Sequence, residues 1–284
     1  MDTRIVLCLP FSLMFGLALP AADPPTWAWP KVVSVGIELV KPGKDAAHQA
    51  NEFAWAKALA QAKSPYHCLG MVPVSGASQA WWVWPMDALA DLEKRRAHLD
   101  AQPAVRARID ALLAKDGEYL TDYKGGTYLL VGDLSHAPGS LAARFYWVNT
   151  LRVKPGRDGD FLEAAKAYTA HCQKAGLQPK WAIYQAVTGT TNPTYLWVIP
   201  LHSLAEADAV LAEDRKMAAS AGPEALKALS RSYADCVLGE ESVLLSVDPK
   251  LSYPSAQAVA LDPEFWKIWA ARPAAKGAVK TEAK

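Results

Sequence analysis

A few titratable side chains of this sequence stand where they could do chemistry. Glu38 lies near the end of a β-branched run, Val32–Val40, in a chain rich in tryptophan. A carboxyl group in an aromatic setting has a raised pKa and can act as a general acid or base. The alternative is a Glu38 that is solvated at a strand end or paired with Lys41. Glu38 is therefore the catalytic candidate, and no second catalytic residue is indicated.

Two histidines are candidates for metal or cofactor ligands. His48 and Glu52 are one helical turn apart, so they share a face of a predicted helix. A His-x3-Glu pair can hold a metal, but two ligands do not complete a site, and we assign none. A partly buried His48 in a first turn explains the pair equally well. His171 adjoins the apolar stripe of a later helix and is either a ligand or simply solvated.

Composition excludes several classes of protein. The chain has 284 residues, 51% of them hydrophobic, and 30 Lys+Arg balance 29 Asp+Glu to a net charge of +1. That balance argues against a nucleic-acid binder, which needs a basic face. No apolar run after the first 22 residues is long enough to cross a bilayer, so we expect no integral membrane span in the mature protein. Eleven tryptophans are far above ordinary usage.

The chain repeats its own pattern, which indicates how the candidate residues are positioned. Val40–Asp45 recurs as residues 153–158, and Trp82 to Pro85 recurs as Trp197 to Pro200. Consistent offsets of this kind indicate two copies of one structural unit. We expect the first copy at residues 31–135 and the second at residues 144–250.

Each copy predicts the order β-α-β-β-α-β. The expected strands are residues 32–40, 68–74, 79–85 and 127–132, then 145–153, 181–187, 195–200 and 242–247, with first helices at 45–63 and 158–175. Pro103 and the Gly222-Pro223 pair interrupt the second helical stretch of each copy. The predicted fold class is α+β, with two tandem ferredoxin-like βαββαβ units packed sheet to sheet as a pseudo-dimeric α+β barrel.

Comparing the copies predicts which strand residues face the space between the sheets. Val33 and Val35 of the first strand, with Trp81 and Val83 of the third, suit the helix-covered face. The alternating set would then line the lumen, together with Glu38. We expect a small-molecule site there or, alternatively, tryptophan rings that merely fill a packed core. The expected ligand-binding residues are Trp82, Trp84, Trp147, Asn149, Tyr195 and Trp197.

The ends of the chain and the cysteines bear on its location. Residues 1–22 resemble a signal peptide, with Arg4 before an apolar stretch and small residues at its end, so we expect a periplasmic or secreted protein. An N-terminal anchor is the alternative. A Pro-rich linker, residues 23–30, follows, and residues 254–284 should hold a short helix and a disordered tail. Cys68, Cys172 and Cys236 form no metal-type spacing and suit buried positions.

A family resemblance rests on the strand that runs from Leu151 to Gly156 and on Phe161 in the helix after it. This pattern resembles the NIPSNAP and antibiotic-biosynthesis-monooxygenase branch of the dimeric α+β barrel superfamily. The resemblance implies a fold and little about activity, since members include cofactor-free monooxygenases, haem-dependent duplicated barrels and small stress-response proteins. In the haem-dependent case His171 would be the ligand candidate.

The prediction for function has three alternatives. The leading one is an exported protein that binds a small apolar or aromatic ligand, is monomeric because both halves lie in one chain, and needs no cofactor. The second is an oxidoreductase of the monooxygenase-like or haem-dependent type. The third is a structural or interaction protein with a packed core and no ligand-sized cavity.

Overall fold

A computed structural model describes residues 29–136 and 143–269. The predicted signal peptide, residues 1–22, most of the Pro-rich linker and the end of the tail lie outside these ranges. None of the described helices combines the length and apolar character that a bilayer crossing requires.

The two halves have the same order of elements, because the same turn and helix-start residues recur in both. The first half comprises β1 (Val32–Val40), α1 (Asp45–Gln61), β2 (Leu69–Pro73), β3 (Gln79–Met86), α2 (Ala90–Asp100), α3 (Pro103–Asp116) and β4 (Leu120–Leu130). The second comprises β5 (Phe145–Val153), α4 (Asp158–Lys174), β6 (Ala182–Thr188), β7 (Thr194–Leu201), α5 (Leu204–Ala221), α6 (Pro223–Cys236) and β8 (Val237–Val247). Pro103 and Pro223 each begin a new helix, and Gly222 between α5 and α6 has a φ of 81°, which favours glycine.

The strands form one closed antiparallel barrel in the order β1-β3-β2-β8-β5-β7-β6-β4. Each half contributes four neighbouring strands. The pairs β2–β8 and β4–β6 join the halves edge to edge, so that no strand edge of the barrel is left open. The halves were expected to pack as two sheets, and they do so as opposite walls of this barrel. Their common element order agrees with a tandem duplication, which stays a prediction.

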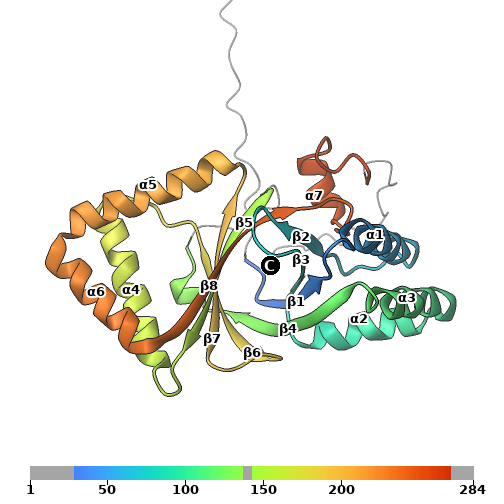
Figure 1. The fold of residues 1–284 in the computed structure, drawn as a ribbon, viewed down its shortest axis with the longest axis horizontal. Helices are drawn as coiled ribbons and strands as arrows, with labels where there is room; N and C mark the ends of the chain where they lie inside the picture. The colour runs from blue at the N-terminus through green and yellow to red at the C-terminus, as the bar shows by residue number, and fades with distance from the viewer. Residues whose placement is uncertain (1–28, 137–142, 270–284) are drawn as a thin grey trace, which may run out of the picture.

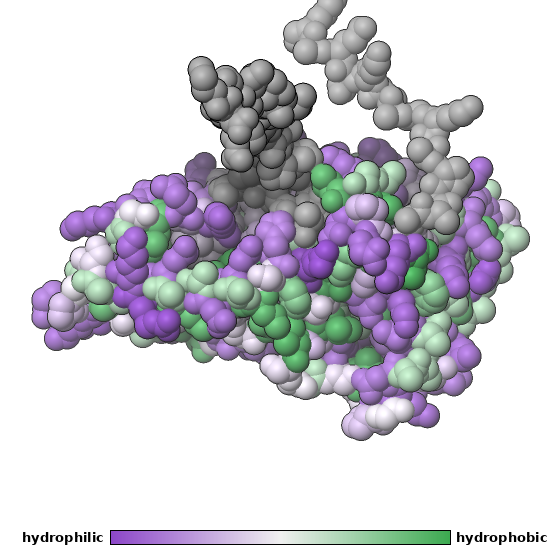
Figure 2. Space-filling model, turned by 90° about the horizontal axis from the view of Figure 1, so that it is seen from above, coloured by the Kyte–Doolittle hydropathy of each residue, from purple (hydrophilic) through white to green (hydrophobic). Residues whose placement is uncertain are grey.

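The helices lie outside the barrel, with α1–α3 at one end of the molecule and α4–α6 at the other (Figure 1). Helix α1 packs on α3, and α4 packs on both α5 and α6. Seen from above, hydrophilic residues dominate both ends, and apolar residues gather toward the middle of this face (Figure 2).

The last strand of each half is longer than expected. β4 begins at Leu120 rather than 127, and β8 at Val237 rather than 242. The first residues of β4 include Asp122 and Lys124, whose types have low strand preference. Pairing with β1 along the full length of that strand makes them a strand all the same.

The expected orientation of the strands is wrong. Val33, Val35, Trp81 and Val83 line the lumen, together with Tyr146 and other apolar residues of β5, β6 and β7. The alternating set faces the helices. Strands covered on both sides are apolar on both faces, so alternation could not decide between the two faces. The lumen is almost filled, with a cavity of about 80 Å³, as eight-stranded barrels allow.

The chain after β8 folds back on the first half. Helix α7 (Ala256–Leu261) begins with the Ser255 hydroxyl accepting from the Ala258 amide. The short helix expected within residues 254–284 is thus α7, and Asp262 to Trp269 after it forms turns. Trp266 is 2% exposed, and the Trp269 indole donates to the Pro249 carbonyl at 2.8 Å. This segment (Asp262 to Trp269) therefore belongs to the core of the first half.

Candidate functional site

A cavity of about 610 Å³ lies in the second half, between the outer face of the sheet and helices α4, α5 and α6. Its volume is within the range of small-molecule sites. Residues of β5 and β7 form its floor, and helices form its walls. The apolar lining includes Leu151, Phe161, Tyr168, Trp181, Trp197, Met217 and Leu226.

Aromatic rings make one continuous wall of this cavity. Trp197 of β7 lies 4.8 Å from the ring of Trp181 and 5.6 Å from the ring of Tyr168 on α4, measured between centroids. Tyr168 and Trp181 are 5.7 Å apart. Such clusters hold their rings in fixed orientations and present flat apolar surfaces to a ligand.

A few polar groups interrupt the apolar lining. The Tyr168 hydroxyl donates to Asp214 of α5, and the Tyr233 hydroxyl of α6 donates to Glu240 of β8. Burial, and then the hydrogen bond to Asp214, raises the pKa of Tyr168, so this hydroxyl keeps its proton at neutral pH. The Asn149 side chain of β5 adds an amide donor and acceptor. The cavity thus has an apolar body with hydrogen-bonding groups at few points.

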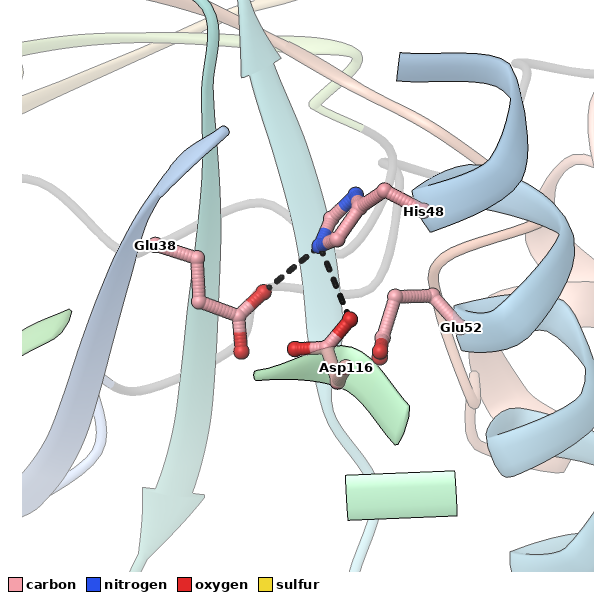
Figure 3. Close-up of side chains that lie close together, drawn as sticks. All are labelled: Glu38, His48, Glu52 and Asp116. Carbon is pink, nitrogen blue, oxygen red and sulfur yellow. Dashed lines mark hydrogen bonds and ion pairs between the residues drawn. The ribbon is translucent and has the colours of Figure 1, made fainter. Parts of the chain in front are cut away.

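In the first half, the corresponding space between sheet and helices holds a buried polar cluster. Glu38 of β1, His48 and Glu52 of α1, and Asp116 at the end of α3 each offer a ligand-type atom within 4.8 Å of the others. Figure 3 shows the Glu38 carboxylate facing the His48 ring from the strand, while Glu52 and Asp116 approach from the helices. The four residues are 7%, 3%, 4% and 3% exposed, respectively.

Hydrogen bonds within this cluster converge on Glu38. His48 Nε2 lies 3.0 Å from Glu38 Oε2 and 3.6 Å from Asp116 Oδ1. The Trp82 indole N–H donates to the same Glu38 oxygen at 2.8 Å. Burial, then the Glu38 and Asp116 charges, raises the pKa of Glu52 to about 10. Burial and Glu38 also raise the pKa of Asp116.

Comparison with known proteins identifies the architecture. No protein-family model and no curated protein matches the sequence. Among solved structures, an anthrone oxidase-like protein is similar with a TM-score of 0.50 at 15% identity, over 76% of this chain and 91% of its own. The chain has the dimeric α+β barrel fold.

Two further solved structures have lower TM-scores. A proposed monooxygenase from Fusobacterium nucleatum subsp. nucleatum gives 0.49 at 12% identity, over 78% of this chain and 93% of its own. A chlorite dismutase variant from Candidatus Nitrospira defluvii has a TM-score of 0.45 at 11% identity, over 84% of this chain and 96% of its own. Dimeric α+β barrels host different activities, so function must be argued from the sites.

The predicted lumen residues all lie on the helix-facing side of the barrel. Asn149 and Trp197 line the large cavity of the second half. Tyr195 lies beneath it, 4.4 Å from the ring of Phe161 and donating to Asp158. In the first half, Trp82 and Trp84 pack edge-on against Trp55 of α1. The Trp147 indole donates to Ser242 at the surface of β8. The lumen site expected from the sequence is therefore wrong in position.

Glu38, too, points at α1 rather than into the lumen. The His48 and Glu52 pair expected on one helix face is present, and Glu38 and Asp116 complete a four-residue group that the sequence did not reveal. One signal was available, because His48 and Glu38 stand where the second copy has Phe161 and Leu151. Asp116 gave no such signal, since loop lengths before α3 and α6 differ.

The position of His171 does not fit the role of a haem ligand. His171 lies on α4 outside the lining of the cavity, and the lining residues include no histidine. A haem held by His171 in this cavity is therefore not supported. Cys68, Cys172 and Cys236 are buried, as expected, and all three are free. Burial raises the pKa of Cys172, at the cavity wall, to about 11, so its thiol stays protonated.

Proposed function

We propose that the protein binds a small aromatic molecule in the cavity between the second-half sheet and helices α4–α6. The observation that carries this proposal is the cavity of about 610 Å³ with its wall of Trp197, Trp181 and Tyr168. The lumen, with about 80 Å³, offers no comparable room. A drug-sized aromatic molecule fits the larger space.

The polar groups narrow the class of ligand. Asp214 and Glu240 are carboxylates at the cavity lining, each already accepting from one tyrosine hydroxyl. A carboxylate has several lone-pair positions and accepts further hydrogen bonds. A ligand with a flat apolar body and a hydroxyl group would stack on Trp197 and donate to one of these carboxylates. Phenols such as 2-naphthol have this chemistry.

A titration with 2-naphthol, followed by tryptophan fluorescence and calorimetry, tests the proposal. Ala164 lines the cavity, whereas Ala170 is exposed on the same helix. Ala164→Trp fills part of the cavity and should weaken binding at least about tenfold, because the ligand then overlaps the new ring. Ala170→Trp is the matched control and should bind as the wild type does. Equal binding by both variants, or none by the wild type, would contradict the proposal and favour a structural role.

A second candidate is oxidation of the bound aromatic molecule by dioxygen. It is favoured by Asp214, a carboxylate beside the aromatic wall that could remove a proton from an acidic ring CH2. The carbanion would be oxidised by O2, so that CH2 becomes C=O, one oxygen atom enters the product and the other leaves as water. The anthrone oxidase-like neighbour shares the fold. Oxygen consumption with anthrone, abolished in Asp214→Asn, would support this step, and its absence would leave a binding protein.

We also propose export, a monomeric state and descent of the two halves from a duplication within the NIPSNAP-like branch. The signal-like residues 1–22 and the repeated Lys-Pro-Gly turns support these proposals. The mature N-terminus, read by mass spectrometry after expression from the full gene, tests export. An uncleaved chain would contradict a signal peptide, and sedimentation at twice the mass would contradict a monomer.

A further inference from the structure

We propose that Glu38, His48, Glu52 and Asp116 form a binding site for one divalent transition-metal cation in the first half. This site lies at the opposite end of the molecule from the aromatic cavity and is independent of the function proposed for it (Figure 1, Figure 3).

The geometry brings four ligand types to one point. One ligand atom from each residue lies within 4.8 Å of all the others. Bonds of about 2.0–2.2 Å in a tetrahedral zinc site place the ligand atoms roughly 3.4 Å from one another. Shifts of less than about 1 Å per side chain would therefore close the cluster around an ion. The ligands come from β1, α1 and α3, so the packed fold holds them together.

The buried carboxyl groups of the cluster outnumber the basic side chains paired with them. Three carboxyl groups are almost fully buried, and within residues 29–136 and 143–269 His48 is the one basic side chain paired with them. No described lysine or arginine forms an ion pair with any of the three. Buried charges in proteins are normally paired or coordinate metals, because desolvating an isolated charge is costly. Without a metal, Glu52 keeps its proton. A divalent ion would displace that proton and neutralise most of the charge of the three carboxylates.

The Glu52 carboxyl group has few hydrogen-bond donors around it. Its carboxyl group is buried and aimed at Asp116 (Figure 3). Among the described residues, the nearest donor is the Asn51 amide at 3.5 Å, the outer limit of a hydrogen bond. Glu38, by contrast, accepts from Trp82 at 2.8 Å. Glu52 also shares a hydrogen bond with the Asp116 carboxyl group, which requires a proton between two acids, and a metal ion could take the place of that proton.

The second half shows that the fold does not need polar residues here. The seventh residue of β5 is Leu151, and the residues of α4 that match His48 and Glu52 are Phe161 and Ala165. These three residues are buried, and the helices pack on the sheet regardless. The polar set in the first half is thus an addition that the architecture does not require.

The donor set selects the class of metal. One imidazole nitrogen with three carboxylates suits Zn2+, Mn2+ or Fe2+, whereas Mg2+ and Ca2+ prefer oxygen ligands alone. Trp82 would orient the Glu38 carboxylate through its indole N–H. Such outer hydrogen bonds hold a ligand in position for the ion.

The test uses the full-length protein after chelation, dialysed against Zn2+ or Mn2+, with Mg2+ as the comparison ion. Bound metal is measured by mass spectrometry, and Mn2+ is also followed by quenching of tryptophan fluorescence, since Trp82 adjoins the cluster. Glu52→Gln removes one ligand while keeping the shape of a protonated carboxyl group. Glu93→Gln, at an exposed position on α2, is the matched control.

We expect one equivalent of Zn2+ or Mn2+ in the wild type and in Glu93→Gln, and affinity at least about 100-fold weaker in Glu52→Gln. No bound metal in the wild type, or unchanged binding in Glu52→Gln, would overturn the proposal. Should Glu52→Gln fail to fold, a chain with Glu38→Leu, His48→Phe and Glu52→Ala, the residues of the second half at these positions, serves instead. Metal retained by that folded chain would likewise overturn the site.

Discussion

Trp82 and Trp197 occupy matching positions in the two halves, yet the structure predicts different effects when each is replaced by phenylalanine. Trp82 is buried, and its N–H donates to Glu38 at 2.8 Å. Trp197 lines the cavity, and its indole donates to no described residue. Trp82→Phe and Trp197→Phe remove similar ring area, so the pair isolates the hydrogen bond.

The expected loss of stability follows from the hydrogen bond that each indole makes and from the size of the ring that is removed. Loss of a hydrogen bond to a buried charged group costs about 1.5–3 kcal/mol. The smaller ring adds roughly 1 kcal/mol of lost packing at either position. Trp82→Phe should therefore lower the free energy of unfolding by about 2–4 kcal/mol, and Trp197→Phe by about 1 kcal/mol. The corresponding melting temperatures fall by about 4–16 °C and about 2–4 °C.

Urea unfolding of the chelated protein, followed by far-ultraviolet circular dichroism, measures both changes without relying on tryptophan emission. In a 2-naphthol titration the variant with the larger effect should be the other one. Trp197→Phe should weaken binding about 2- to 12-fold, which corresponds to the interaction energy of one aromatic pair, and Trp82→Phe should leave binding unchanged. Unfolding free energies within about 0.5 kcal/mol of each other would contradict the role of the Trp82 hydrogen bond. Weaker binding by Trp82→Phe would contradict the position of the ligand site.

Three further predictions follow from burial. Glu52 has a pKa of about 10 in the fold against a usual 4.5, so above pH 4.5 the unfolded chain loses this proton first. The free energy of unfolding of chelated wild type should therefore fall with rising pH relative to Glu52→Gln; parallel pH profiles would contradict the shift. Burial raises the pKa of Cys68 to about 12, so iodoacetamide at pH 8 should label Cys68 only after unfolding, as mapped by mass spectrometry; rapid labelling of folded protein would refute this. Trp266→Ala should cost about 3–5 kcal/mol in urea unfolding, whereas Ile268→Ala, at an exposed neighbour, should cost less than about 0.5; equal costs would mean that the segment after α7 is not part of the core.

The order of elements could be predicted from the sequence because it depends on local signals. The Lys-Pro-Gly turns end β1 and β5, and Pro103 and Pro223 begin α3 and α6. The closed barrel followed from two units whose apolar strands needed a cover. The element order is set by residues close together in the chain, and the closed barrel by the need to cover the apolar strands; both are confirmed.

The facing of the strands could not be predicted, because both faces are apolar. Trp81 and Trp82 point to opposite sides, and nothing in their types says which side holds the lumen. The site was misplaced for this reason. The cavity depends on how far α4–α6 stand from the sheet, and the cluster depends on Asp116 reaching His48 across many residues. Both are consequences of tertiary packing, which local patterns do not encode.

The position of a bound ligand tests the central claim most directly. A crystal grown with 6-bromo-2-naphthol would reveal the bromine by its anomalous scattering. We predict one strong peak in the cavity between β7 and α4, beside Trp197 and Tyr168. A peak in the barrel lumen beside Trp81, or no peak in a crystal whose cavity is open to solvent, would contradict it.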